Sequence, residues 1–278
     1  MATPTLTRHV LPGALGDILV DVRAGSRATP QPAVLLVHGF KGFKDYAFLP
    51  VFAERLPRSG FAAVTASVGG SGVDEQGDFT LLDRFARNTY SRELDDLHVV
   101  ARAMLAGELG FVPPTSLGVV GHSRGGGMAL LLAHELPAVR AVVTWSGVGK
   151  ARRHTDAELE AWQRLGTIQV LHQRLRIRLP LSWEVAADCL AHEETRFNIA
   201  EAARTLDRPW LQIHGTADTT VPLAEGEALA AVAGPGHQFL GIAEADHTYG
   251  TKHPWAGSSV DADAVFEATL AFLSRHLS

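Results

Sequence analysis

The feature that most constrains this chain is a pentapeptide near its middle. Residues 121–125 read Gly-His-Ser-Arg-Gly, a G-x-S-x-G pattern. A short apolar run over residues 117–120 precedes it, and helix-forming residues 128–134 follow it. A serine between a strand and a helix is held in a strained turn that exposes its Oγ and faces the helix N-terminus. The pattern also occurs by chance as a plain turn, but these flanks favour Ser123 as a nucleophile.

The order of apolar segments predicts an α/β fold. Continuous apolar runs at residues 33–37, 61–66, 117–120 and 141–145 are typical of strands buried on both faces. Segments with helical spacing separate them, and residues 6–22 read as an opening hairpin. Right-handed crossovers then give a mostly parallel, twisted sheet with helices on both faces.

The strand–helix alternation stops at residues 149–204 and resumes at residues 210–214. The interrupting segment holds charged, helix-like stretches and no strand of the buried type. We therefore expect residues 1–148 and 205–278 to form one core, with residues 149–204 as a helical cap inserted at the strand ends.

A serine nucleophile needs a base and a carboxylate that orients the base. Asp218 follows the strand expected at residues 210–214, and His247 follows the strand expected at residues 238–242. The carboxyl ends of neighbouring parallel strands share one edge of a sheet, where ligand sites form. The order Ser123, Asp218, His247 predicts a catalytic triad.

Other residues of the right type compete for these roles. His214, His237 and His253 are alternative bases. Asp246 and Glu244 are alternative acids, but they lie so close to His247 in the chain that their side chains would usually point away from it.

The oxyanion formed during acyl transfer needs two backbone N–H donors. Arg124, which follows the nucleophile, supplies one. The strand expected at residues 33–37 runs into His38-Gly39-Phe40, so the N–H group of Phe40 is the second predicted donor.

Together these motifs resemble the α/β-hydrolase superfamily over nearly the whole chain. The segment 38–42, His-Gly-Phe-Lys-Gly, and the moderate insertion are more narrowly similar to cinnamoyl/feruloyl-esterase-like and dienelactone-hydrolase-like carboxylesterases. The chain departs from these relatives at residues 67–72, which read Ser-Val-Gly-Gly-Ser-Gly where they often carry Asp-x-x-Gly-x-Gly.

We therefore expect a serine-dependent carboxylic-ester hydrolase that acts on small acyl or aryl esters through an acyl-enzyme. The same triad also serves lactonases, thioesterases, and small peptidases or amidases. A non-catalytic binding protein of this fold is less expected, because such proteins typically lose a triad member. The residues expected to line a substrate pocket are Trp162, Leu179, Leu181, Trp183 and Tyr249, although the four in the insertion could equally pack it onto the core.

Composition sets the remaining expectations. The 278 residues are 46% hydrophobic and 20% charged, with a net charge of −5, which does not suggest a nucleic-acid partner. The single cysteine, Cys189, excludes an internal disulfide. No apolar stretch approaches membrane-spanning length and no signal peptide is evident, so we expect a soluble cytoplasmic protein that does not bind membranes. Without HExxH or CxxC motifs we expect no metal and no organic cofactor, only a small-molecule ester as partner, and a monomer or homodimer.

Overall fold

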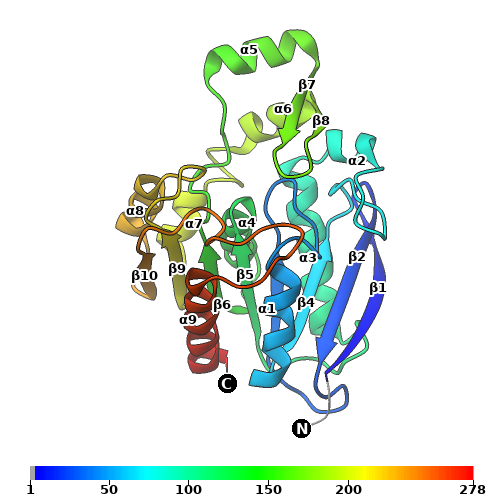
Figure 1. Cartoon of the computed structure of the whole chain (residues 1–278), viewed down its shortest axis with the longest axis vertical. Helices are drawn as coiled ribbons and strands as arrows, with labels where there is room; N and C mark the ends of the chain where they lie inside the picture. Colours follow the sequence, from blue (N-terminus) through cyan, green and yellow to red (C-terminus); the bar gives the residue numbers. More distant parts are fainter. Residues whose placement is uncertain (1–3, 278) are drawn as a thin grey trace.

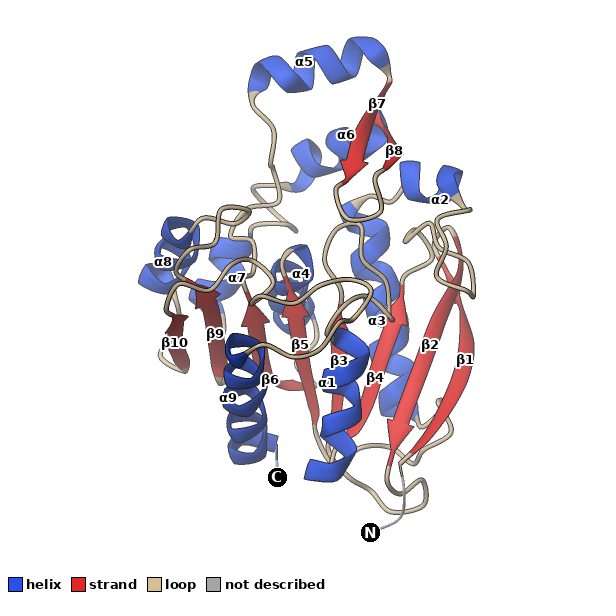
Figure 2. Cartoon of the chain, in the orientation of Figure 1, coloured by secondary structure: helices blue, strands red, loops and turns tan. Residues whose placement is uncertain are grey.

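The core of the protein is an eight-stranded sheet, whose strands lie side by side from β10 to β1 in Figure 2. The computed structural model describes residues 4–277. The strand order is β1-β2-β4-β3-β5-β6-β9-β10. The six strands from β4 to β10 in this order run parallel to one another, and β2 is antiparallel to both of its neighbours, β1 and β4. The strands are β1 (Thr5–Gly13), β2 (Gly16–Ala24), β3 (Ala33–Val37), β4 (Ala62–Ser67), β5 (Leu117–His122), β6 (Val139–Trp145), β9 (Trp210–Gly215) and β10 (His237–Ile242).

Helices cover both faces of this sheet (Figure 1), so the predicted α/β-hydrolase architecture is confirmed. Alternate residues of the central strands pack into two hydrophobic cores, one on each face of the sheet. One core lies between the sheet and helices α1 and α9, and the other lies between the sheet and helices α3, α4, α7 and α8. This is why those strands are apolar at nearly every position. The helices are α1 (Leu49–Arg55), α3 (Tyr90–Ala106), α4 (Arg124–Glu135), α7 (Ile199–Thr205), α8 (Leu223–Val232) and α9 (Val260–Leu277).

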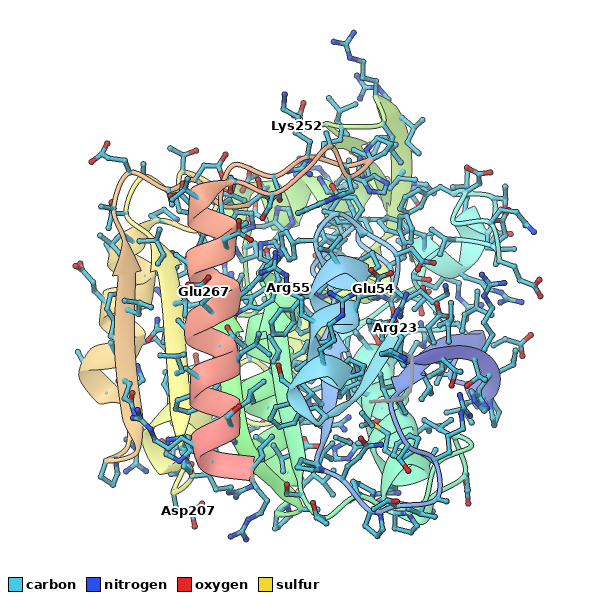
Figure 3. All side chains as sticks on the ribbon, turned by 60° about the horizontal axis from the view of Figure 1, so that its bottom comes forward. Arg23, Glu54, Arg55, Asp207, Lys252 and Glu267 are labelled. Carbon is cyan, nitrogen blue, oxygen red and sulfur yellow. The ribbon has the colours of Figure 1, made fainter. Side chains whose placement is uncertain are left out.

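Helices α1 and α9 lie side by side on one face, with charged side chains such as Glu267 on their outer side (Figure 3). An ion pair joins them, since Nη2 of Arg55 lies 2.6 Å from Oδ1 of Asp263. One of the segments with helical spacing, residues 48–58, forms an α-helix only as far as Arg55. It continues as a 3₁₀ turn, Leu56–Ser59, and Gly60 ends the turn with a φ of 88°. Pro57 lacks an N–H group, which explains why the α-helix does not continue. Among residues 4–277, no helix is both long and apolar enough to cross a membrane.

A smaller layer stands over the carboxyl ends of the parallel strands (Figure 1). It contains the helices α5 (Asp156–Leu165) and α6 (Trp183–His192), with α2 (Leu82–Ala86) at its edge. It also contains an antiparallel hairpin, β7 (Thr167–His172) and β8 (Ile177–Ser182), which the sequence analysis did not predict. Helix α7 packs against α4 in the body of the molecule. The assignment of residues 149–204 to one cap remains a prediction.

Candidate active site

Ser123 occupies a sharp turn between β5 and α4. Its backbone has φ 58° and ψ −124°, a strained conformation for a residue with a side chain. Close packing explains the flanking glycines, because a Cβ on Gly121 would lie 2.0 Å from the Gly125 carbonyl oxygen. A Cβ on Gly125 would lie 2.4 Å from the carbonyl oxygen of His38. The turn therefore needs glycine at both positions and presents the serine at the strand ends.

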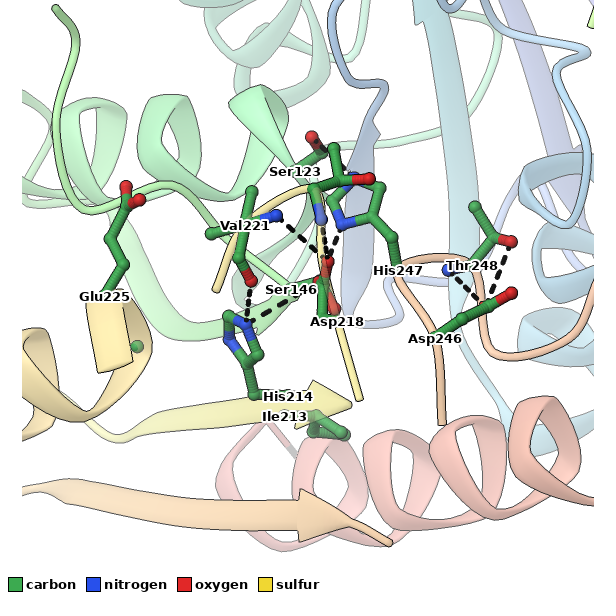
Figure 4. A network of polar contacts seen from close by, with 12 residues as sticks. Ser123, Ser146, Ile213, His214, Asp218, Val221, Glu225, Asp246, His247 and Thr248 are labelled. Atoms are coloured by element: carbon green, nitrogen blue, oxygen red, sulfur yellow. Dashed lines mark hydrogen bonds and ion pairs between the residues drawn. The ribbon is translucent and has the colours of Figure 1, made fainter. Parts of the chain in front are cut away.

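The structure brings Ser123, His247 and Asp218 into one hydrogen-bonded chain (Figure 4). Oγ of Ser123 lies 3.0 Å from Nε2 of His247, and Nδ1 of His247 lies 2.7 Å from Oδ2 of Asp218. With Nδ1 protonated, Nε2 is free to accept the serine proton. This arrangement can activate a hydroxyl group as a nucleophile.

Asp218 is held by the loop that follows β9. Its Oδ1 accepts hydrogen bonds from the N–H groups of Thr220 and Val221, at 2.8 and 2.9 Å. Burial raises the pKa of Asp218, but the hydrogen bonds from His247 and from the two backbone groups outweigh it, so the pKa lies below its usual range. The carboxylate is therefore ionised at neutral pH. His214 supports this loop, since its Nε2 lies 2.8 Å from the Val221 carbonyl oxygen.

The competing residues are engaged elsewhere. Asp246 turns away from His247 (Figure 4), and its Oδ1 accepts from the N–H groups of Thr248 and Gly250 at 2.8 and 2.9 Å. His237 pairs with the side chain of Gln212, at 2.9 Å. The other candidates are also separate from Ser123. Nδ1 of His253 accepts a hydrogen bond from the N–H group of Ala47, and Glu244 is exposed.

The Phe40 peptide has a fixed orientation. The Gly39 carbonyl oxygen lies 2.9 Å from both Nδ1 of His38 and the N–H group of Gly42. In a trans peptide the N–H of Phe40 points the opposite way. Within residues 4–277, the N–H groups of Phe40 and Arg124 donate to no other protein atom. Both donors are therefore available for an oxyanion beside Ser123.

Comparison with known proteins decides the family. The model of the dienelactone hydrolase family matches residues 20–172, which include Ser123 and end before Asp218. The chain belongs to the dienelactone hydrolase family. It is therefore a member of a family of hydrolytic enzymes. A search of curated proteins found no match.

Solved structures agree on the fold. The esterase domain of a Rhodothermus marinus protein is 21% identical, with a TM-score of 0.65, and the match covers 99% of this chain and 100% of that one. A dienelactone hydrolase from Anabaena variabilis is 17% identical, with a TM-score of 0.66, over 99% and 100%. Est1E from Butyrivibrio proteoclasticus, solved with ferulic acid bound, is 17% identical, with a TM-score of 0.74, over 96% and 98%.

In this member of the dienelactone hydrolase family, two cavities that differ in polarity meet at Ser123. One, of about 290 Å³, lies beside α5, β7, β8 and α6 and has mostly apolar walls that include Val148, Leu159 and Val185. The other, of about 440 Å³, is more polar. Its walls include Lys41, Gln173, Arg174, Thr220, His247 and Thr248. Within residues 4–277, no group of three or more His, Cys, Asp or Glu side chains is placed to hold a metal ion.

The predicted pocket residues divide into two groups. Trp162 and Leu181 line the apolar cavity. Leu179 and Trp183 line neither cavity, although they pack in the same hydrophobic cluster as Trp162 and Leu181. Tyr249 also lies outside both walls and is buried below the site. Its hydroxyl lies 3.0 Å from Oγ of Ser146 and 3.2 Å from the Ile213 carbonyl oxygen. The structure therefore does not support a substrate-binding role for these three residues.

Sequence reasoning missed a role for His122. Nε2 of His122 lies 2.9 Å from the His247 carbonyl oxygen, and the two rings are 4.8 Å apart. Burial, reinforced by the nearby charge of His247, lowers the pKa of His122 to about 3. It is therefore neutral near pH 7, and it can donate to the backbone of His247. Its place beside Ser123 in the pentapeptide was the only sequence signal for this contact.

Proposed function

We propose that this protein is a serine-dependent carboxylic-ester hydrolase acting on small acyl or aryl esters. The observation that carries the proposal is the hydrogen-bonded chain from Ser123 through His247 to Asp218. Two free backbone donors beside it, and two cavities whose walls both include the serine, also support an acyl transfer from a bound ester.

The reaction begins when Ser123 Oγ attacks the ester carbonyl carbon while His247 Nε2 takes the hydroxyl proton. Asp218 stabilises the imidazolium that results. The N–H groups of Phe40 and Arg124 donate to the oxyanion of the tetrahedral intermediate. Each such donor is worth roughly 10²–10³ in rate.

The intermediate collapses when His247 returns the proton to the leaving alcohol. The alcohol departs and the acyl group stays on Ser123. Water then attacks the acyl-enzyme while His247 takes one of its protons. The second collapse releases the acid and restores the serine hydroxyl.

The positions of these groups support one orientation of the ester. The leaving oxygen must lie on the side of His247, which lines the polar cleft. Arg124, an oxyanion donor, lines the apolar pocket, as do Trp162 and Leu181. The acyl group therefore occupies the apolar pocket, and the alcohol occupies the polar cleft.

Hydrolysis of 4-nitrophenyl butyrate by purified wild-type protein, Ser123→Ala and His247→Ala tests the proposal. We expect the wild type to be active and to react with a fluorophosphonate, and both variants to lose activity by several orders of magnitude while remaining folded. Full activity in Ser123→Ala would contradict the mechanism.

Thioester, lactone and amide substrates in the same assay measure which leaving groups are accepted. Cell fractionation tests the expected cytoplasmic location.

A further inference from the structure

The side chain of Arg124 is buried beside the oxyanion hole. Although its backbone N–H faces the reaction site, only 6% of the residue is exposed. Its guanidinium carbon lies 3.9 Å from the ring centre of Tyr90 and 5.6 Å from that of Phe40. Both distances are within the range of cation–π attraction. The guanidinium of one oxyanion donor therefore contacts the ring of the other.

A buried carboxylate holds this guanidinium. Oε2 of Glu93 lies 2.8 Å from Nη2 of Arg124, and only 3% of Glu93 is exposed. This contact is an ion pair, and the side-chain amide of Asn88 donates a hydrogen bond to the same Oε2, at 3.3 Å. Glu93 lies one turn after Tyr90 in α3, so both side chains project from the same side of the helix. The start of α3 thus supplies two of the three partners of the Arg124 guanidinium, Tyr90 and Glu93.

We propose that Glu93 is a positioning residue for the oxyanion hole. By pairing with Arg124 it keeps the guanidinium against Tyr90 and Phe40, and it thereby links the two backbone donors to the rigid start of α3. The inference rests on the proposed function, since the two N–H groups act as an oxyanion hole only if Ser123 forms an acyl-enzyme.

Stability alone is a weak reason for such a pair. Removing two charges from water is costly, and apolar residues of similar volume often replace a buried ion pair without loss of stability. A positioning role makes a different prediction from a packing role. If Glu93 only packs, its neutral replacements will leave kcat unchanged in protein that remains folded.

The kinetic test compares Glu93→Gln with Asp95→Asn on 4-nitrophenyl butyrate. Asp95 is a matched control, because its exposed carboxylate lies on the same helix and pairs with Arg196 at 2.7 Å. We expect Glu93→Gln to lower kcat about tenfold to a hundredfold. This decrease is smaller than, or similar to, the decrease in kcat that follows the loss of one oxyanion donor. We expect KM to stay within about twofold of the wild-type value. Asp95→Asn is expected to keep kcat within about twofold.

Glu93→Gln leaves a buried guanidinium unpaired and can fail to fold. The double variant Glu93→Gln/Arg124→Met removes both charges and keeps the backbone N–H of residue 124. We expect it to fold and to show the same loss of kcat. Unchanged kcat in the folded double variant would overturn the proposal.

The amide resonance of Phe40, observed in protein labelled with [¹⁵N]phenylalanine, provides a readout that does not depend on activity. We expect it to shift or broaden in Glu93→Gln and in the double variant, and to stay in place in Asp95→Asn. An unmoved resonance in the folded double variant would overturn the proposal. If the wild-type protein hydrolyses no ester, the proposed function fails, and this resonance still decides whether Glu93 positions the Phe40 peptide.

Discussion

The indole Nε1 of Trp162 donates a hydrogen bond to the carbonyl oxygen of Leu181, 3.1 Å away. This bond joins helix α5 to strand β8, two elements that are separated in the chain by strand β7 and the turn of the hairpin. Both residues line the apolar cavity beside Ser123. Trp162 and Leu181 therefore form adjoining parts of the wall of this cavity, and under the proposed function changes in this wall should alter which acyl chains are accepted.

Leu181→Ala is expected to favour longer acyl chains. The truncation enlarges the apolar cavity, and each additional buried methylene of substrate is worth roughly 0.8 kcal/mol, about a fourfold effect. The kcat/KM ratio of 4-nitrophenyl octanoate to butyrate measures the shift. Leu179→Ala is the matched control, because Leu179 lies two residues earlier in β8, is fully buried and lines neither cavity. It should lower Tm but leave the ratio within about twofold, and equal shifts in both variants would refute the assignment of the wall.

Asp218→Asn is expected to reduce kcat by about 10³–10⁴, since the amide favours the wrong tautomer of His247. Asp246→Asn should cost less than about tenfold, because the hydrogen bonds of Asp246 go to Thr248 and Gly250 rather than to the His247 ring. Both kcat values should be measured on 4-nitrophenyl butyrate, with active sites counted by fluorophosphonate labelling. If Asp246→Asn is inactive and Asp218→Asn is not, the acid has been misassigned.

His122 is expected to make the protein less stable as the pH falls. Its pKa is about 3 when folded, against an ordinary value near 6.5. Between these values the unfolded chain binds a proton that the native state does not, so its contribution to the free energy of unfolding decreases on acidification. From pH 6.5 to 4.5 the loss is about 2 kcal/mol. His122→Phe should therefore show a smaller drop in Tm between pH 7 and 4.5 than the wild type. An equal drop would show that His122 is not held neutral.

An isomeric pair of esters tests the orientation of the substrate. 2-Hydroxyethyl hexanoate carries an apolar acid and a polar alcohol, whereas hexyl glycolate carries the reverse. We expect kcat/KM, normalised to the rate of alkaline hydrolysis, to favour 2-hydroxyethyl hexanoate by more than about tenfold, because its chain enters the apolar pocket. A preference for hexyl glycolate would reverse the assignment of the two cavities.

The sequence predicted the sheet and its helices, because buried parallel strands are apolar throughout and the helices have apolar faces. The sequence also predicted that Ser123, Asp218 and His247 lie at the same edge of the sheet, since each of them follows a strand. Their catalytic roles remain predictions until the variants are measured.

Other features depend on contacts that no local pattern encodes. The pairing of Glu93 with Arg124 joins two helices. Strands β7 and β8 are largely exposed or half-buried, so they lack the continuous apolar run that marks the buried strands of the main sheet. Tyr249 looked accessible in a loop, but its φ of 53° belongs to a turn that directs the side chain into the core.

The most direct test of the account is the mass of the peptide that contains Ser123 after acid quenching during turnover of 4-nitrophenyl butyrate. The account predicts that this peptide gains the mass of one butyryl group in the wild type, and that the adduct accumulates further in a variant with slowed deacylation. It also predicts that Ser123→Ala gains no such mass. Ester hydrolysis in the wild type without any butyryl adduct on this peptide, together with full activity of Ser123→Ala, would contradict the account.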